Sequence, residues 1–377
     1  MKKDYCVGIR TFITRNLEIK RILDFGDVQV FESATNYTGI FFFTTNGKNS
    51  YEFEYHKYRN IGREIDTTEF RESLDTEASF KDIIIANSGK LGGDAWNFQV
   101  SYADTLLTKI QNESGLLSEF VVELFEGIAS GKDDVFYIDE GTIREYKIEK
   151  GVLFPLLKGK DIKRYVLNWS GTYVLYPYDK NSKPYTESEM KRLFPNALGY
   201  LRQNRELLSG RGYFEKSNKF WFELWNQRKF QNFSQIRIVS PEISDRNNFA
   251  LTDSYFGNTK TYHIILKNRS YEHYLAFLGL LNSTLFDYVY KSITTPHAGG
   301  FYAYKSQFLN LLPISRKFSA YEDEIANSVN KVFAAKRKDA EADTSALERE
   351  IDALVYRLYG LTEEEIKVVE NSGSRNP

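Results

Sequence analysis

The chain reads DVFYID at residues 134–139, TYVLYP at 172–177, IRIVSPEIS at 236–244 and TYHIIL at 261–266. Each run is rich in aromatic and β-branched residues, and Gly, Pro, Asn and Asp separate the runs. Short runs of this composition between turn-forming residues are typical of strands. The stretch from 128 to 270 therefore predicts a mixed α+β domain.

A second pattern lies at the N-terminal end, in residues 1–47. Helical spacing relates Ile9, Phe12, Ile13 and Leu17, and two apolar runs follow, RILDF (21–25) and GIFFFTT (39–45). Consecutive aromatic and β-branched residues predict strands buried on both faces, as in an α/β sheet. Since this piece is too short for a domain, we interpret it as the end of a larger sheet.

The remaining patterns are mostly helical. Apolar residues recur at helical spacing in 101–126, 271–292 and 320–359; Gly360 is expected to stop the last helix, and Thr362-x-x-Glu365 to cap a final short one. Residues 48–100 are polar and mixed. The predicted organisation is an α/β remnant at 1–47, a connector at 48–100, a mixed α/β domain at 101–315 and a helical region at 316–377.

Composition excludes several classes of protein. Fifty Lys and Arg against 51 Asp and Glu give a net charge of −1, so the whole chain is not a basic nucleic-acid binder. One cysteine excludes a disulfide framework and a cysteine-ligated zinc site, and the four histidines lack metal-ligand spacing. No stretch approaches the ~18 apolar residues of a membrane span, and the start lacks a signal-peptide apolar region, which predicts a cytoplasmic protein.

The motifs for common chemistry are missing. GIASGK (127–132) lacks P-loop spacing, and Asp133 would repel a phosphate, so we interpret it as a turn. Asp134 with Glu145-x-Lys147 has the residue types of a nuclease metal site, although alternating charges on an exposed strand produce the same string. The chain has no Pro-Pro pair and no strand–Gly-turn–helix unit for S-adenosylmethionine. We therefore predict no catalytic, cofactor-binding or metal-ligating residue in this chain.

The near-neutral total charge conceals a basic middle and an acidic tail. Residues 199–249 hold nine Lys and Arg against five acids, whereas residues 339–370 hold ten acids against three bases. Cations neutralise phosphates, and arginine can also present two donors to guanine. We predict DNA contacts from Arg202, Arg205, Arg211, Lys219, Arg228 and Lys229. Interleaved aromatic residues, including Trp221, Phe222 and Trp225, are expected to belong to the core, because large aromatic residues dominate cores; in the alternative interpretation they pack against sugars or unstacked bases.

Two further segments carry candidate contacts. LLKGKDIKRYVLNW (156–169) contributes Lys158, Lys160, Lys163 and Arg164, and its alternative interpretation is a solvated turn. TTPHAGGFYAYKSQF (294–308) contributes Thr294, His297, Tyr302 and Lys305, which could reach phosphates or base edges. Gly299 and Gly300 would let the backbone approach a partner closely, although an ordinary mobile loop has the same composition.

An ordered series of segments resembles a known family. The series includes FEGIASGKDDVFYID, FPLLKGKDIKRY, YLRQNRELLSGRGYF, FWFELWNQR, IRIVSPEIS, LGLLNSTLFDYVYK and IDALVYRLYGLTEEEIKVVE. It is similar to the C-terminal part of type IIG restriction-modification enzymes and adenine-specific DNA methyltransferases, including the TaqI-like specificity domain. The resemblance implies sequence-specific recognition of duplex DNA, so that an adenine can be flipped into a methyltransferase pocket. It also implies that residues 1–47 are the last strands of a methyltransferase domain.

Three hypotheses follow. The leading one is a DNA target recognition module without catalytic motifs, which binds double-stranded DNA and partners either a catalytic methyltransferase or nuclease chain or a second copy of itself. The second is a subunit or fragment that completes an adenine-specific methyltransferase in trans, with S-adenosylmethionine bound only through the partner half. The third is a protein-interaction scaffold without DNA affinity.

Overall fold

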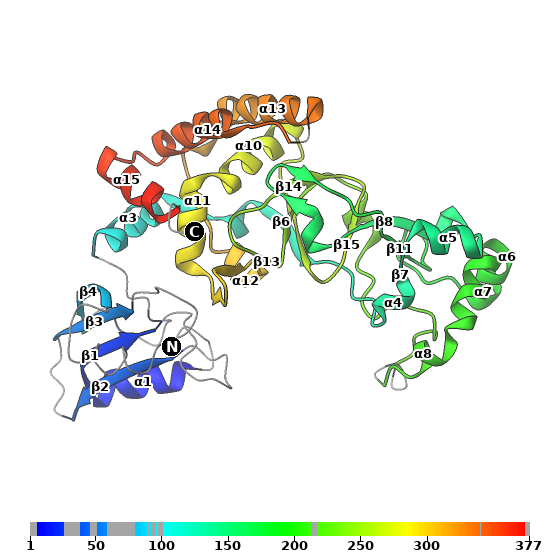
Figure 1. Cartoon of the computed structure of the whole chain (residues 1–377), viewed down its shortest axis with the longest axis horizontal. Coiled ribbons are helices and arrows are strands. Elements are labelled where there is room, and N and C mark those ends of the chain that lie inside the picture. The colour runs from blue at the N-terminus through cyan, green and yellow to red at the C-terminus, as the bar shows by residue number, and fades with distance from the viewer. Residues whose placement is uncertain are drawn as a thin grey trace. The chain divides into compact units, whose positions relative to one another are not determined.

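A computed structural model describes residues 6–25, 38–45, 51–58, 80–88, 91, 96, 101–212, 214, 217–339 and 341–373. The chain divides into two compact units (Figure 1). The first unit comprises residues 1–112 with 295–301, and the second comprises 113–294 with 302–377. Each unit is described by itself below.

The first unit contains a four-stranded sheet with strand order β2-β1-β3-β4. Its elements are α1 (Val7–Asn16), β1 (Glu18–Asp24), β2 (Gly39–Thr44), β3 (Glu52–Tyr58), β4 (Phe80–Asn87), α3 (Ser101–Asn112) and β17 (Pro296–His297). Strand β1 is antiparallel to β2 and parallel to β3, and β3 is antiparallel to β4. Ile13 of α1 packs against Ile22, Phe53 and Tyr55 of the sheet. A helix followed by two strands was predicted here, and the structure has them in that order.

Two expectations for this unit differ from the structure. The aromatic strand β2 lies at an edge of the sheet, and Phe42 and Phe43 are 44% and 38% exposed, so the prediction of burial on both faces was wrong. An edge strand has a neighbour on one side only, which leaves its side chains less covered. The segment 48–100, expected as a connector, contributes β3 and β4 to the same sheet as β1.

The second unit is a mixed α+β structure, as predicted. One antiparallel sheet has the order β14-β12-β16-β6, and another has the order β15-β8-β11-β7. The strands of these sheets are β6 (Val121–Glu126), β12 (Arg237–Pro241), β14 (Ala250–Thr252) and β16 (Thr261–Leu266), then β7 (Tyr137–Ile138), β8 (Leu153–Leu157), β11 (Tyr173–Leu175) and β15 (Phe256–Gly257). β15 runs parallel to β8, and the other pairs are antiparallel.

Short ladders and helices complete the part of this unit that precedes the C-terminal helices. The pairs β9 (Ile162–Lys163) with β10 (Val166–Leu167), β13 (Ile243–Ser244) with β18 (Phe301–Ala303), and β5 (Ser114–Leu116) with β19 (Pro313–Ser315) are small antiparallel ladders. The helices are α4 (Asp133–Phe136), α5 (Glu140–Tyr146), α6 (Glu187–Leu193), α7 (Pro195–Gln203), α8 (Arg205–Ser209), α9 (Phe230–Phe233) and α12 (Ser306–Leu309). A core that includes Leu156, Val174, Leu198, Phe222 and Phe233 joins the β8 sheet to α7 and α9.

The C-terminal part of the second unit is helical. Its helices are α10 (Tyr271–Asn282), α11 (Thr284–Ile293), α13 (Glu322–Lys338), α14 (Ser345–Leu358) and α15 (Glu363–Gly373), and α13 packs against both α10 and α14 (Figure 1). Gly360 has a φ of +59° where the long helix was expected to stop. The predicted capping box is present, with Thr362 N–H donating to Glu365 at 2.7 Å and Glu365 N–H donating to Thr362 at 3.3 Å.

Three predicted helices are shorter or divided. The pattern over 271–292 forms α10 and α11, because Ser283 adopts an extended conformation and its hydroxyl accepts from Phe286 N–H. The pattern over 320–359 forms α13 and α14, with Asp343 accepting from Ser345 N–H between them. The pattern over 101–126 is helical only to Asn112, because β5 and β6 pair with β19 and β16. Pairing with distant strands overrides local helical spacing here.

Candidate nucleic-acid interface

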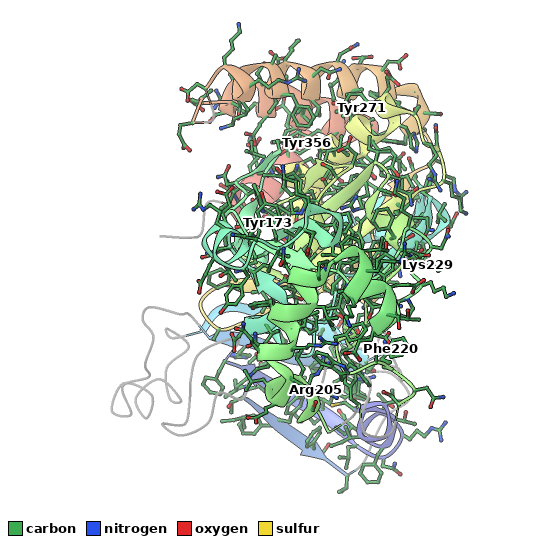
Figure 2. All side chains as sticks on the ribbon, turned by 90° about the vertical axis from the view of Figure 1, so that its right-hand side faces the viewer. Tyr173, Arg205, Phe220, Lys229, Tyr271 and Tyr356 are labelled. Carbon is green, nitrogen blue, oxygen red and sulfur yellow. The ribbon has the colours of Figure 1, made fainter. Side chains whose placement is uncertain are left out.

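The predicted DNA contacts from the basic middle fall into exposed and buried positions. Arg202 and Arg205 are exposed on α7 and α8. Arg202 forms an ion pair with Glu187 at 2.8 Å. The guanidinium of Arg205, which is labelled in Figure 2, lies over the Trp221 ring, 5.0 Å from its centroid. Lys229 is exposed before α9 and makes no ion pair with any described residue. These three side chains are accessible to a polyanion.

Arg211 is in the interior, where we expected it to contact DNA. Its side chain is 6% exposed, and it donates to the carbonyls of Leu208, Ser130, Glu223 and Trp221 at 2.7–3.2 Å. The guanidinium also lies over the Phe214 ring, 3.7 Å from its centroid. Because its donors are directed at protein groups, Arg211 holds three chain segments together and does not belong to the accessible surface.

Lys219 and Arg228 are partly engaged with protein groups. Lys219 Nζ donates to the Leu224 carbonyl at 3.1 Å and lies 3.8 Å from Glu223. Arg228, at a left-handed φ of +57°, donates to the Gly127 carbonyl at 3.2 Å and lies 3.5 Å from Glu126. Both side chains are 27% exposed, so a ligand can reach them only beside an existing acidic partner.

The second basic segment forms the β9–β10 hairpin and the turn before it. Lys160 and Lys163 are exposed without an ion pair to the described residues, and Lys158 is half-buried. Asp161, 2% exposed, accepts from Lys158 N–H at 2.8 Å and from the Ser170 hydroxyl at 3.2 Å, so its carboxylate closes the turn. Arg164 differs from the expectation: its side chain is 13% exposed and binds the Glu348 carboxylate and the Asn282 carbonyl. Arg164 therefore anchors the hairpin on the C-terminal helices.

The third candidate segment contributes less than expected. Thr294 is 2% exposed, and its hydroxyl donates to the Ala303 carbonyl at 2.6 Å, so it is structural. Lys305 lies 3.7 Å from Glu242, and Lys291 lies over the Tyr302 ring, 5.4 Å from its centroid. His297 is half-buried in β17, within the residues grouped with the first unit. Gly299 and Gly300 both have a φ near +80°.

Sequence inspection missed two lysines beside Lys229. Lys180 and Lys183 are exposed on a turn in which Asp179 accepts from the backbone of Asn181 and Lys183 at 2.8 and 2.9 Å. Two hydrogen bonds join this turn to the start of α9: Gln231 donates to the Lys180 carbonyl, and Phe230 N–H donates to the Ser182 hydroxyl, both at 2.7 Å. We call Lys180, Lys183 and Lys229 the α9 lysine patch.

The sequence strings with other possible chemistry are structural. Ala129 of GIASGK forms an isolated β-bridge with Asn226, which is consistent with a turn. Asp134 is 88% exposed on α4, whereas Glu145 lies on α5 and Lys147 caps that helix in a left-handed conformation. Among the residues that the structure describes, no group of three His, Cys, Asp or Glu side chains could hold a metal ion. No helix in the described ranges has the length and apolar character needed to cross a bilayer.

The comparison with protein families places the basic segments in one module. Residues 154–314 match the TaqI-like C-terminal specificity domain. The domain includes the β9–β10 hairpin, the basic middle and the loop before α12, so the resemblance seen in the sequence is confirmed over these residues.

Curated relatives match over most of the chain. It is 22% identical to the type II methyltransferase M.BstVI of Geobacillus stearothermophilus, over 98% of this chain and 64% of the relative. It is 23% identical to the type II methyltransferase M.BanIII of Aneurinibacillus aneurinilyticus, over 94% of this chain and 65% of the relative. The chain thus spans less than two thirds of the length of these relatives.

A solved structure shares the fold. The type IIL restriction-modification enzyme MmeI, determined in complex with DNA, aligns with a TM-score of 0.55 over 96% of this chain and 47% of that enzyme, at 12% identity. S-adenosylmethionine is the cofactor that the methyltransferase relatives imply.

Proposed function

We propose that this chain is the sequence-specific DNA recognition module of a restriction-modification adenine methyltransferase system, acting in the cytoplasm. The match of residues 154–314 to a specificity domain carries this proposal. The names of the methyltransferase relatives support the same conclusion. They favour it over a scaffold without DNA affinity. The catalytic half, with its S-adenosylmethionine, would be supplied by another part of the same protein or by a partner chain.

Exposed lysines of the specificity domain support a phosphate-contacting role. Lys160, Lys163 and the α9 lysine patch lie on backbone that internal hydrogen bonds hold rigid. When the backbone that carries a lysine is already fixed, binding to DNA releases counterions and the protein loses little conformational entropy. An exposed cation that is already paired with an acid, such as Arg202, would only exchange its carboxylate for a phosphate. We therefore expect such cations to contribute less to the affinity for DNA. The leading candidate contacts are therefore the unpaired lysines. Arg205, Arg228 and Lys305 are secondary candidates.

A salt titration of DNA binding tests this function. The wild-type chain should lose affinity for a labelled duplex as salt rises, and each phosphate contact contributes about 0.9 to the slope of log K against log salt. A Lys160→Gln, Lys163→Gln, Lys229→Gln triple variant should lower that slope by about 2–3. The control replaces Lys317, Lys331 and Lys367, exposed lysines on the C-terminal side of the matched segment, and should leave the slope unchanged. Binding that stays flat with salt, or equal losses from both triples, would contradict the proposal.

A further inference from the structure

Two large aromatic side chains of the basic middle face solvent. Trp225 is 44% exposed and Phe220 is 40% exposed, while Phe222, between them in sequence, is fully buried. Phenylalanine and tryptophan normally bury most of their surface, because removing their large apolar area from water stabilises the fold more than burying a smaller side chain does. Rings exposed to this extent, in a segment that matches a specificity domain, are available to contact a bound partner.

The backbone beneath both rings is held rigidly. Trp225 N–H donates to the Ser130 carbonyl at 3.2 Å, and Asn226 and Ala129 exchange backbone hydrogen bonds at 2.8 and 3.0 Å. Phe220 N–H donates to the Glu223 carboxylate at 2.7 Å, and its ring stacks on buried Phe222 with a centroid distance of 5.5 Å. Fixed rings lose little conformational entropy on binding, which favours them as contact residues.

Buried Arg211 connects the segment that carries both rings to the segment of Ser130. Its guanidinium donates to the carbonyls of Trp221 and Glu223 on the ring-bearing segment and to Ser130, which also accepts from Trp225 N–H. Phe214, beneath the guanidinium, lies 6.2 Å from the Trp225 ring. The arginine expected to contact DNA thus fixes the position of aromatic residues that can do so.

The charge around the rings favours a polyanionic partner. Arg205, an exposed residue, lies over the ring of Trp221, which follows Phe220 in the chain. We propose that Trp225 and Phe220 pack against bases of the bound DNA at a step whose stacking is opened, while Arg205 contacts the adjacent backbone. The inference rests on the proposed function. It adds a base-contacting surface that does not depend on phosphate neutralisation.

Equilibrium binding of the full chain to a fluorescein-labelled duplex, selected by the wild-type protein from a random-sequence pool, tests the inference. Trp225→Ala should weaken binding about 5- to 150-fold, which corresponds to ~1–3 kcal/mol per stacked base. Phe220→Ala should weaken it by a smaller factor, and Trp225→Phe should restore most of the loss. The salt slope should stay at its wild-type value, because no phosphate contact is removed. Tyr271→Ala is the matched control, since Tyr271 is 42% exposed on α10, well away from Phe220 (Figure 2).

A second readout locates the opened step directly. Substituting 2-aminopurine at successive positions of the selected duplex should give enhanced fluorescence at one step with wild-type protein and no enhancement with Trp225→Ala. If wild-type protein selects no duplex from the pool, the proposed function itself is wrong. If it selects a duplex that Trp225→Ala and Phe220→Ala bind as tightly as Tyr271→Ala does, the recognition function stands and the aromatic contact is overturned.

Discussion

At the residue scale, the arginines of the basic middle show that side-chain type does not decide role. Arg205 and Arg211 are six positions apart, yet one is exposed over an indole and the other is buried with four carbonyl acceptors. Burying a guanidinium without acceptors would cost several kcal/mol, so the carbonyls around Arg211 must be supplied by the fold. Three of them come from residues 10–81 positions away, which no local pattern reveals.

His263 is a buried histidine whose hydrogen bonds specify a neutral ring. Arg237 Nε donates to its Nδ1 at 3.1 Å, so the proton lies on Nε2, which faces the Thr261 hydroxyl at 3.0 Å. The Thr261 hydroxyl in turn donates to the Asn258 carbonyl at 2.7 Å. Burial, followed by the nearby charges of Arg237 and Arg228, holds the pKa of His263 well below its usual range.

This environment predicts that stability falls on acidification. In the unfolded chain the ring takes up a proton below about pH 6.5, whereas the folded protein excludes it, so the unfolded state binds more protons there. The free energy of unfolding should decline by up to about 1.4 kcal/mol per pH unit below pH 6.5 from this group. Urea unfolding from pH 8 to 5 measures the decline, with His297→Gln as a control that should retain it. A native-state ring titration of His263 near pH 6.5 by NMR would contradict the prediction.

At the element scale, the β9–β10 hairpin combines a costly turn with a distant anchor. Tyr165, at the second turn position, has a φ of +65°, a conformation that glycine or asparagine usually supplies. The backbone cost is roughly 1–2 kcal/mol. Tyr165 N–H donates to the Phe249 carbonyl at 2.9 Å, and Arg164 is held by Glu348 of α14. The helices thus stabilise the turn that presents Lys160 and Lys163.

A double-mutant cycle on Arg164 and Glu348 tests this anchor. Arg164→Ala should lower the free energy of unfolding by roughly 2–4 kcal/mol, because Glu348 would be left partly buried without its cation. The double variant should cost less than the sum of the single ones by more than about 1 kcal/mol. The exposed pair Arg202 and Glu187 is the matched control and should couple by less than about 1 kcal/mol. Equal coupling energies in the two cycles would show that the Arg164–Glu348 pair stabilises the fold no more than an exposed surface pair does.

At the scale of the whole molecule, the two units have separate cores. Phe53 packs with Ile22 and Tyr55 in the first unit, and Phe222 packs with Leu198 and Phe233 in the second. Units with their own cores generally unfold as separate cooperative blocks. We therefore predict more than one calorimetric transition for the full chain.

Core substitutions assign the transitions. Phe53→Ala and Phe222→Ala each remove a buried ring and should cost about 3–5 kcal/mol in the unit that contains it. Differential scanning calorimetry should show each variant lowering one transition midpoint while the other remains at its wild-type temperature. A single transition that both variants lower equally would mean that the units unfold together.

The distribution of the basic side chains is also a property of the whole molecule. We predicted DNA contacts from the cations of the basic middle, but Arg211 is buried, and Arg202, Lys219 and Arg228 lie beside acids. Other exposed lysines without an ion pair to the described residues, Lys160, Lys163, Lys180 and Lys183, lie outside the basic middle in the chain. Paired surface charges lower nonspecific attraction for DNA, which leaves more of the discrimination to base contacts.

The sequence by itself determined features that depend on neighbouring residues. Gly360 and the Thr362–Glu365 box mark helix ends correctly, and runs rich in aromatic and β-branched residues locate β11, β12 and β16. The ordered motifs were enough to identify the specificity domain. Helix caps can be predicted locally because their hydrogen bonds join residues only a few positions apart. Strands can be predicted locally because their side chains follow a short period along the chain.

Only the tertiary structure decided which charged and aromatic side chains reach solvent. Arg164 is anchored by Glu348, 184 positions away. The turn of Lys180 is joined to Phe230 and Gln231, which follow Lys229, by hydrogen bonds that span about 50 residues. Trp225 and Phe222 have similar sequence surroundings, yet one faces solvent and the other is core. Burial depends on which distant segments pack over a residue, and the sequence around that residue does not contain this information.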